Sequence, residues 1–145
     1  MTALSPAPPA QLLLGRTLHF RADPFHAPLE QAAQIDSAGG VLITDGKITQ
    51  VGDGSALRAA HPQAKVIDCG RGLIMAGFVD AHVHFAQTAI IASWGKRLID
   101  WLNSYTFPEE MRFADAGYAA QIAAHYLDLT AAHGTTTVAS FCTSH

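Results

Sequence analysis

Hydrophobic and polar positions follow two different rhythms along the chain. From Leu12 to about Ile74, short apolar and β-branched runs are broken by turn residues, which predicts a small β domain. The clearest signal is the pair of runs 41–44 and 47–51 on either side of Asp45-Gly46. An Asp-Gly pair readily adopts the two positive φ angles of a type I′ turn, so this segment predicts a β-hairpin.

The rest of this region predicts short elements. We expect a strand within residues 12–20, a proline-containing loop over 23–28, and two short strands over 65–68 and 73–75. A short helix over 55–60 would be capped by Ser55 and ended by His61-Pro62.

From Gly77 onward the pattern changes to strand, helix, strand. Residues 78–85 and 135–141 read as strands, 96–103 as a short amphipathic helix, and 115–132 as a long helix. Asp115 can cap the long helix, and Gly134 stands where a left-handed residue commonly ends one. Because such βαβ units build parallel sheets and barrels, the chain predicts an α/β fold. A complete (β/α)₈ barrel takes about 250 residues, so this unit would be about a quarter of one.

The strand 78–84 carries the candidate chemistry. Regular alternation would place Phe78, Asp80, His82 and His84 on one face. Two imidazoles two residues apart on a strand can share a metal ion, and barrel enzymes place their chemistry at the C-terminal ends of strands. A surface His-x-His pair is the alternative. Asp80 would either orient a histidine or be a solvated, turn-capping carboxylate.

Longer stretches carry a resemblance to a known family. Residues 77–84 resemble the first barrel strand of the amidohydrolase superfamily, and the β region with its hairpin is similar to the composite β-sandwich of these enzymes. Residues 85–88, 98–110 and 133–137 resemble the guanine deaminases within that superfamily. The resemblance implies that residues 1–75 are the N-terminal part of the β-sandwich domain. It also implies that residues 76–145 are the first strand-helix-strand portion of a truncated TIM-type barrel.

The resemblance also implies site residues and chemistry. His82 and His84 match the family's first two zinc ligands, and His84 and Gln87 match residues that contact the purine. In the family one zinc ion per active site supplies an activated water that attacks C2 of guanine, giving xanthine and ammonia. The remaining metal ligands and the acid-base carboxylate come from later strands, so we expect no catalytic residue in this chain and no activity from it alone.

Several other residues are further candidates for the site or for the core. Gln87 taken alone would be an exposed loop amide. Four aromatic residues either wall a purine pocket or belong to the core: Trp94, Trp101, Tyr105 and Phe107. Cys142, Thr143 and His145 follow the second strand and would face the barrel mouth. Cys69 is interpreted as a buried or half-buried thiol that acts as a small hydrophobe.

Composition narrows the class of protein. The net charge of -3 and nine scattered Lys and Arg residues argue against nucleic-acid binding. No apolar run approaches the roughly 20 residues that span a bilayer, and Met1 to Ala10 lacks the charged start of a signal peptide. We therefore expect a cytoplasmic protein. The resemblance to guanine deaminases implies a small purine as partner and, in the full-length form, a homodimer.

Three functions follow from these patterns. The first is the N-terminal part of a zinc-dependent guanine deaminase. The second is another amidohydrolase acting on a different heterocyclic ring, and the third is a non-enzymatic truncated remnant that acts as a binding or interaction module. The cytidine-deaminase signature of His-x-Glu with Pro-Cys-x-x-Cys does not occur, which excludes that route to deamination.

Overall fold

The computed structural model describes residues 10–144 and divides into two compact units, one ending at Ala76 and one beginning at Gly77. Expectations that concern residues 1–9 and His145 lie outside this range. The two units are described separately. That they are parts of a β-sandwich domain and of a hydrolase barrel stays a prediction.

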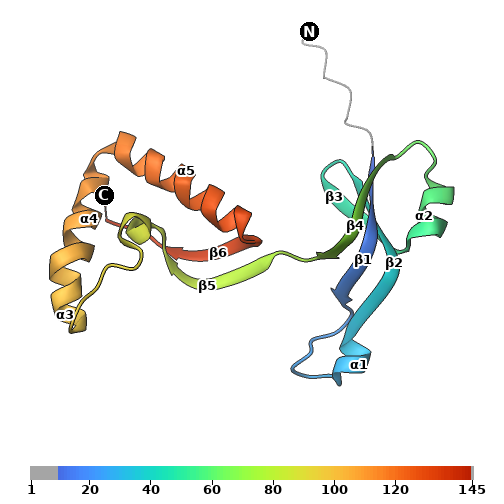
Figure 1. Ribbon diagram of the computed structural model, residues 1–145, viewed down its shortest axis with the longest axis horizontal. Helices are drawn as coiled ribbons and strands as arrows, with labels where there is room; N and C mark the ends of the chain where they lie inside the picture. The colour runs from blue at the N-terminus through green and yellow to red at the C-terminus, as the bar shows by residue number, and fades with distance from the viewer. Residues whose placement is uncertain (1–9, 145) are drawn as a thin grey trace, which may run out of the picture. The chain divides into compact units, whose positions relative to one another are not determined.

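The first unit is built on a four-stranded sheet with the order β3-β2-β1-β4 (Figure 1). Its strands are β1 (Gln11–Phe20), β2 (Ala33–Thr44), β3 (Lys47–Asp53) and β4 (Lys65–Met75). The β1–β2 and β2–β3 pairs are antiparallel, whereas β4 runs parallel to β1. Two short helices complete the unit, α1 (Leu29–Ala32) and α2 (Gly54–Ala60).

The predicted hairpin is confirmed. Strands β2 and β3 pair across the turn, and Asp45 and Gly46 have φ angles of 51° and 73°. Both angles lie in the left-handed region that a type I′ turn requires. The core of the unit lies beside this hairpin, where α2 packs Leu57 against the buried Leu12 and Leu42.

The predicted cap of α2 is wrong by two residues. Asp53, rather than Ser55, is the N-cap, and its carboxylate accepts the Ala56 N–H at 2.7 Å. The Ser55 hydroxyl donates to the same carboxylate at 2.6 Å. The Ser55 and Ala56 bonds together lower the pKa of Asp53, because they favour its ionised form. Both residue types are good caps, and only the position of the helix start decides between them.

The two short strands expected over 65–68 and 73–75 form one strand, β4. Pairing with β1 passes from Leu14–Asp68 to Arg16–Leu73, so residues 69–72 of β4 stand opposite the single residue Gly15. Gly70 takes a φ of 55° within this irregularity. The sequence pattern therefore predicted the two parts of β4 that pair with β1, and the bulge between them appeared as a gap between two separate strands.

The second unit is a parallel pair of strands joined by a long helical connection. Strands β5 (Phe78–His84) and β6 (Thr135–Phe141) pair in parallel, which confirms the predicted βαβ unit. The connection contains η1 (Phe85–Ile90), α3 (Leu98–Trp101), η2 (Leu102–Thr106), α4 (Phe107–Met111), η3 (Arg112–Ala114) and α5 (Ala116–Ala132). Since the strands are parallel, both end at the same edge of the pair (Figure 1).

Helix α5 begins and ends as its sequence predicts. The Asp115 carboxylate accepts the Gly117 and Tyr118 N–H groups at 2.7 and 3.2 Å. Gly134 follows the helix with a φ of 83°. One side of α5 contributes Ile122 to a buried cluster with Ala86 and Phe113, and this cluster fixes η1 and η3 against the helix.

The helix predicted over 96–103 is replaced by three short pieces. Helix α3 has only four residues, and a π-helical turn, η2, follows it before α4. Pro108 stands at the start of α4, where its missing N–H cannot continue an α-helical ladder from the preceding turn. Within residues 10–144, no helix is both long and apolar enough to cross a membrane.

Replacing Asp115 with Ala should destabilise the second unit by about 1 kcal/mol, because two N–H groups at the start of α5 lose their acceptor. Both tryptophans, Trp94 and Trp101, belong to this unit, so urea unfolding followed by tryptophan fluorescence reports on it alone. Asp115→Asn keeps a capping oxygen and should remain near wild type. Equal stability of Asp115→Ala and wild type would contradict the capping role.

Candidate functional site

The two candidate metal ligands lie together at the C-terminal end of β5. The ring centroids of His82 and His84 are 5.4 Å apart, so both imidazoles project on the same side of the strand. Phe141, which pairs with His84 across the sheet, stacks on the His84 ring at 4.8 Å and lies 5.0 Å from the His82 ring. The Phe141 side chain on β6 therefore packs against both imidazoles.

Asp80 does not share the environment of the histidines. Between Asp80 and Val83 the register advances three residues on β5 but two on β6, which is a β-bulge. Regular alternation from Phe78 to His84 is therefore broken. The Asp80 carboxylate accepts the backbone N–H of His82 at 3.1 Å and so stabilises the bulge. This hydrogen bond agrees with the reading of Asp80 as a local capping carboxylate, and the reading in which it orients an imidazole stays a prediction.

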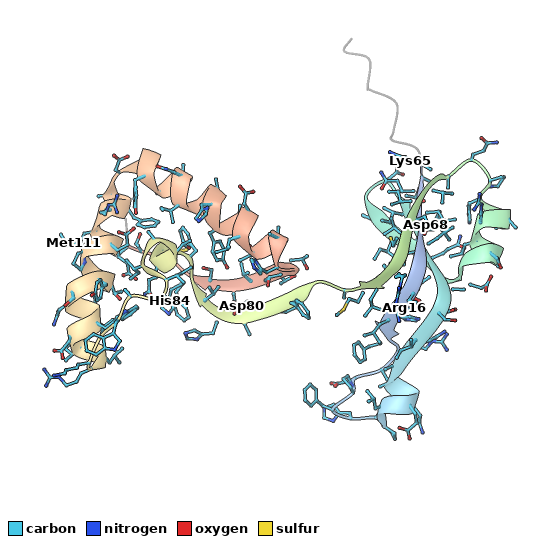
Figure 2. The ribbon with its side chains drawn as sticks, viewed as in Figure 1. Arg16, Lys65, Asp68, Asp80, His84 and Met111 are labelled. Atoms are coloured by element: carbon cyan, nitrogen blue, oxygen red, sulfur yellow. The ribbon has the colours of Figure 1, made fainter. Side chains whose placement is uncertain are left out.

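The face that carries the imidazoles is open in this chain. His82 is exposed and His84 half-buried. Figure 2 shows Asp80 and His84 along β5, with His84 at the end that leads into η1. The imidazole nitrogens are therefore available to bind an ion.

A cavity of about 370 Å³ lies next to the imidazoles. Besides His82 and His84, its lining includes Gln87 from η1, Trp101 from α3 and Tyr126 from α5. The structure thus brings three of the predicted residues, His82, His84 and Gln87, to one cavity. It also adds Tyr126, which no sequence motif singled out.

The Gln87 side chain is held in place by a glutamate. Its amide nitrogen donates to the Glu110 carboxylate of α4 at 3.0 Å, in a half-buried position. Nothing in the residue pattern identified Glu110. The adjacent Glu109 is buried and bonds instead to Tyr118 and Arg112.

Tyr126 is the most buried polar residue of the cavity lining. It is 7% exposed, and its hydroxyl has no hydrogen-bond partner among residues 10–144. Burial raises the pKa of Tyr126, and the negative charge of Asp80 raises it further. Tyr126 therefore remains a neutral hydroxyl at neutral pH and presents a donor that a bound molecule can use.

The other aromatic and polar candidates separate into two groups. Trp101 lines the cavity and donates its indole N–H to Ser93, while Trp94 is 72% exposed and does not line this cavity. Phe107 lines a second cavity of about 250 Å³ with Glu110, Cys142 and Thr143. Tyr105 lines neither cavity.

The donor set fits half of a zinc site. Imidazole nitrogens are common zinc ligands, and two neighbouring ones are a partial set, since a catalytic zinc takes three protein ligands. Over residues 10–144 no group of three His, Cys, Asp or Glu side chains could hold a metal ion. His82 and His84 can thus form a complete catalytic zinc site only together with protein ligands from outside this set.

Comparison with known proteins places the chain in a family. Residues 73–145 match the model of the amidohydrolase family, and residues 39–64 match the imidazolonepropionase-like composite domain of bacteria. The chain belongs to the amidohydrolase family.

Several relatives of this chain are amidohydrolases of one kind, the guanine deaminases. A "Probable guanine deaminase" of Deinococcus radiodurans is 41% identical over 129 residues, which are 86% of this chain and 29% of the relative. The crystal structure of guanine deaminase from Bradyrhizobium japonicum superposes with a TM-score of 0.84 at 33% identity, over 93% of this chain and 30% of that one. A guanine deaminase from C. acetobutylicum with bound guanine gives 0.76 at 28% identity, over 94% and 30%.

These comparisons confirm the predicted resemblance and the α/β fold class. The chain spans less than a third of the length of the relatives it matches.

Replacing Asp80 with Asn should lower the pKa of Tyr126, because the substitution removes a negative charge that disfavours the tyrosinate. The fold should be retained, since the Asn oxygen can still accept the His82 N–H. Titration of ¹³Cζ-labelled tyrosine by NMR measures the shift. Tyr118 is an internal control, because burial and its neighbour Glu109 raise its pKa without Asp80. An unchanged Tyr126 titration would contradict the coupling.

Proposed function

We propose that this chain supplies the first part of a zinc-dependent guanine deaminase, which converts guanine to xanthine and ammonia. The observation that carries the proposal is the convergence of His82, His84 and Gln87 on one cavity at the C-terminal end of β5. Barrel enzymes place their chemistry at this edge. The similarity to guanine deaminases over most of the chain supports guanine as the substrate.

His82 and His84 would hold the zinc ion. Their imidazoles lie on one side of β5, and Phe141 stacks on one of them, which restricts ring rotation before the metal binds. A bound zinc ion lowers the pKa of a water ligand to near neutrality and so supplies the hydrolytic water. Because two ligands are not a catalytic set, the remaining ones would come from barrel strands that follow this chain in the family.

Gln87 would bind the purine. Its carboxamide offers both a donor and an acceptor to the edge of a heterocycle, and it lies on the cavity beside the metal ligands. Trp101 would form part of the apolar wall, and the Tyr126 hydroxyl would offer a donor from α5. Residues 1–75 would belong to the β-sandwich domain that accompanies the barrel in this family.

The isolated 145-residue chain should bind zinc weakly, with a Kd between about 1 µM and 1 mM, and should not deaminate guanine. Half of a ligand set gives about half of the binding free energy of a complete site. Competition with a chromogenic chelator measures the Kd. His82→Ala should weaken binding at least about tenfold, and His125→Ala, on an exposed position of α5, should leave it unchanged. Xanthine formation by the purified chain would contradict this expectation.

A hybrid enzyme tests the function itself. In this hybrid, residues 1–145 replace the matched stretch of the Deinococcus radiodurans relative, whose later strands supply the missing ligands. We expect the zinc-loaded hybrid to convert guanine to xanthine, measured by absorbance and ammonia release. His84→Ala should lower kcat by at least about 10²-fold, and His125→Ala should not change it.

The result that counts against the proposal is equally specific. A hybrid that is folded by circular dichroism and loaded with zinc, yet inert toward guanine, would show that these residues do not complete the site.

A further inference from the structure

We propose that Glu110 is a positioning residue that holds the Gln87 carboxamide in one of its two flipped orientations and so sets which purine edge Gln87 can bind. The proposal rests on the proposed function, because it takes Gln87 as the purine-contacting residue. Its starting observation is the 3.0 Å hydrogen bond from the Gln87 amide nitrogen to the Glu110 carboxylate.

Only one orientation of the Gln87 amide is compatible with this neighbour. A carboxamide has nearly the same shape after a half-turn, but the turn exchanges its donor NH₂ group and its acceptor oxygen. An ionised carboxylate can only accept hydrogen bonds, so the NH₂ group must face Glu110. The reversed orientation would place two oxygens with negative charge density against each other.

The position of the pair makes the restraint effective. Both side chains are half-buried, so solvent screens their interaction less than it would on the surface. Gln87 lines the cavity beside His82 and His84, whereas Glu110 lines the second cavity with Phe107. The carboxylate therefore restrains the amide without being part of the lining of the cavity that holds the metal ligands.

A fixed amide distinguishes two classes of purine. Gln87 donates one N–H to Glu110, so its oxygen and its second N–H remain for the purine. The positions of these two groups cannot be swapped. A 6-oxopurine presents an acceptor oxygen next to an N1–H donor, and a 6-aminopurine presents an amino donor next to an N1 acceptor. An amide that is free to flip can match both, but an amide held in one orientation matches only one.

The test substitutes Glu110 with Gln in the hybrid enzyme. Glu110→Gln keeps the size of the side chain and can either accept from Gln87 or donate to it, so both orientations of Gln87 become allowed. Hypoxanthine and adenine are suitable probes, because each lacks the 2-amino group that is hydrolysed and differs from the other at position 6. Calorimetry measures their Kd values without turnover.

We expect the wild-type hybrid to prefer hypoxanthine and Glu110→Gln to reduce the ratio of the two Kd values about tenfold. Asp128→Asn makes the same charge change on an exposed position of α5 and should leave the ratio unchanged. In a Gln87→Ala background, Glu110→Gln should have no further effect, since Glu110 acts through Gln87. An unchanged ratio in Glu110→Gln, the absence of any preference in wild type, or equal effects in both backgrounds would overturn the proposal.

A second measurement uses the 145-residue chain itself. Glu110→Ala should shift both side-chain amide proton resonances of Gln87 in ¹⁵N-resolved NMR spectra, and Asp128→Asn should not. Unshifted Gln87 resonances would overturn the restraint. Failure of the proposed function has a different signature, because it appears as a folded, zinc-loaded hybrid that does not deaminate guanine, whatever the ratio of the two Kd values.

Discussion

The parallel pairing of β5 with β6 is the constraint on which the rest of the second unit depends. Parallel strands cannot be joined by a tight turn, so a long connection must return the chain to the start of the sheet. That connection carries every helical element of the unit between His84 and Thr135. Pairing also brings the ends of both strands to one edge, where Phe141 reaches the imidazoles of β5. One hydrogen-bonded ladder thus determines both the topology and the neighbours of the candidate metal ligands.

The bulge in β5 adjusts this arrangement locally. In a regular strand Asp80 would point to the same side as His82 and His84, and a carboxylate would stand next to the metal ligands. The extra residue between Asp80 and Val83 breaks this regular alternation, and the Asp80 carboxylate accepts the backbone N–H of His82. The negative charge of Asp80 raises the pKa of Tyr126 on α5.

Local patterns in the sequence correctly predicted the elements that depend on interactions between residues close together in the chain. The hairpin at Asp45-Gly46 and the helix start at Asp115 depend on residues within one turn of each other, and both were correct. The bulge at Asp80 and the π-helical turn before Pro108 depend on pairing with distant segments or on competing hydrogen-bond registers, which periodicity does not record. Of the site, the pair His82 and His84 was visible from spacing, and Gln87 came from family resemblance. Glu110, which holds Gln87, comes from another helix, and no sequence pattern joins the two.

The exposed apolar side chains of the parallel pair follow from the same constraint. A parallel sheet is ordinarily covered on both faces, and a two-stranded one is marginally stable by itself. In this chain Phe78, Val79 and Phe141 are 58%, 68% and 54% exposed, so the strands contribute little burial. The buried cluster of Ala86, Phe113 and Ile122 lies instead in the helical connection. The connection therefore stabilises the unit and positions Gln87, while the open face of the strands presents the imidazoles.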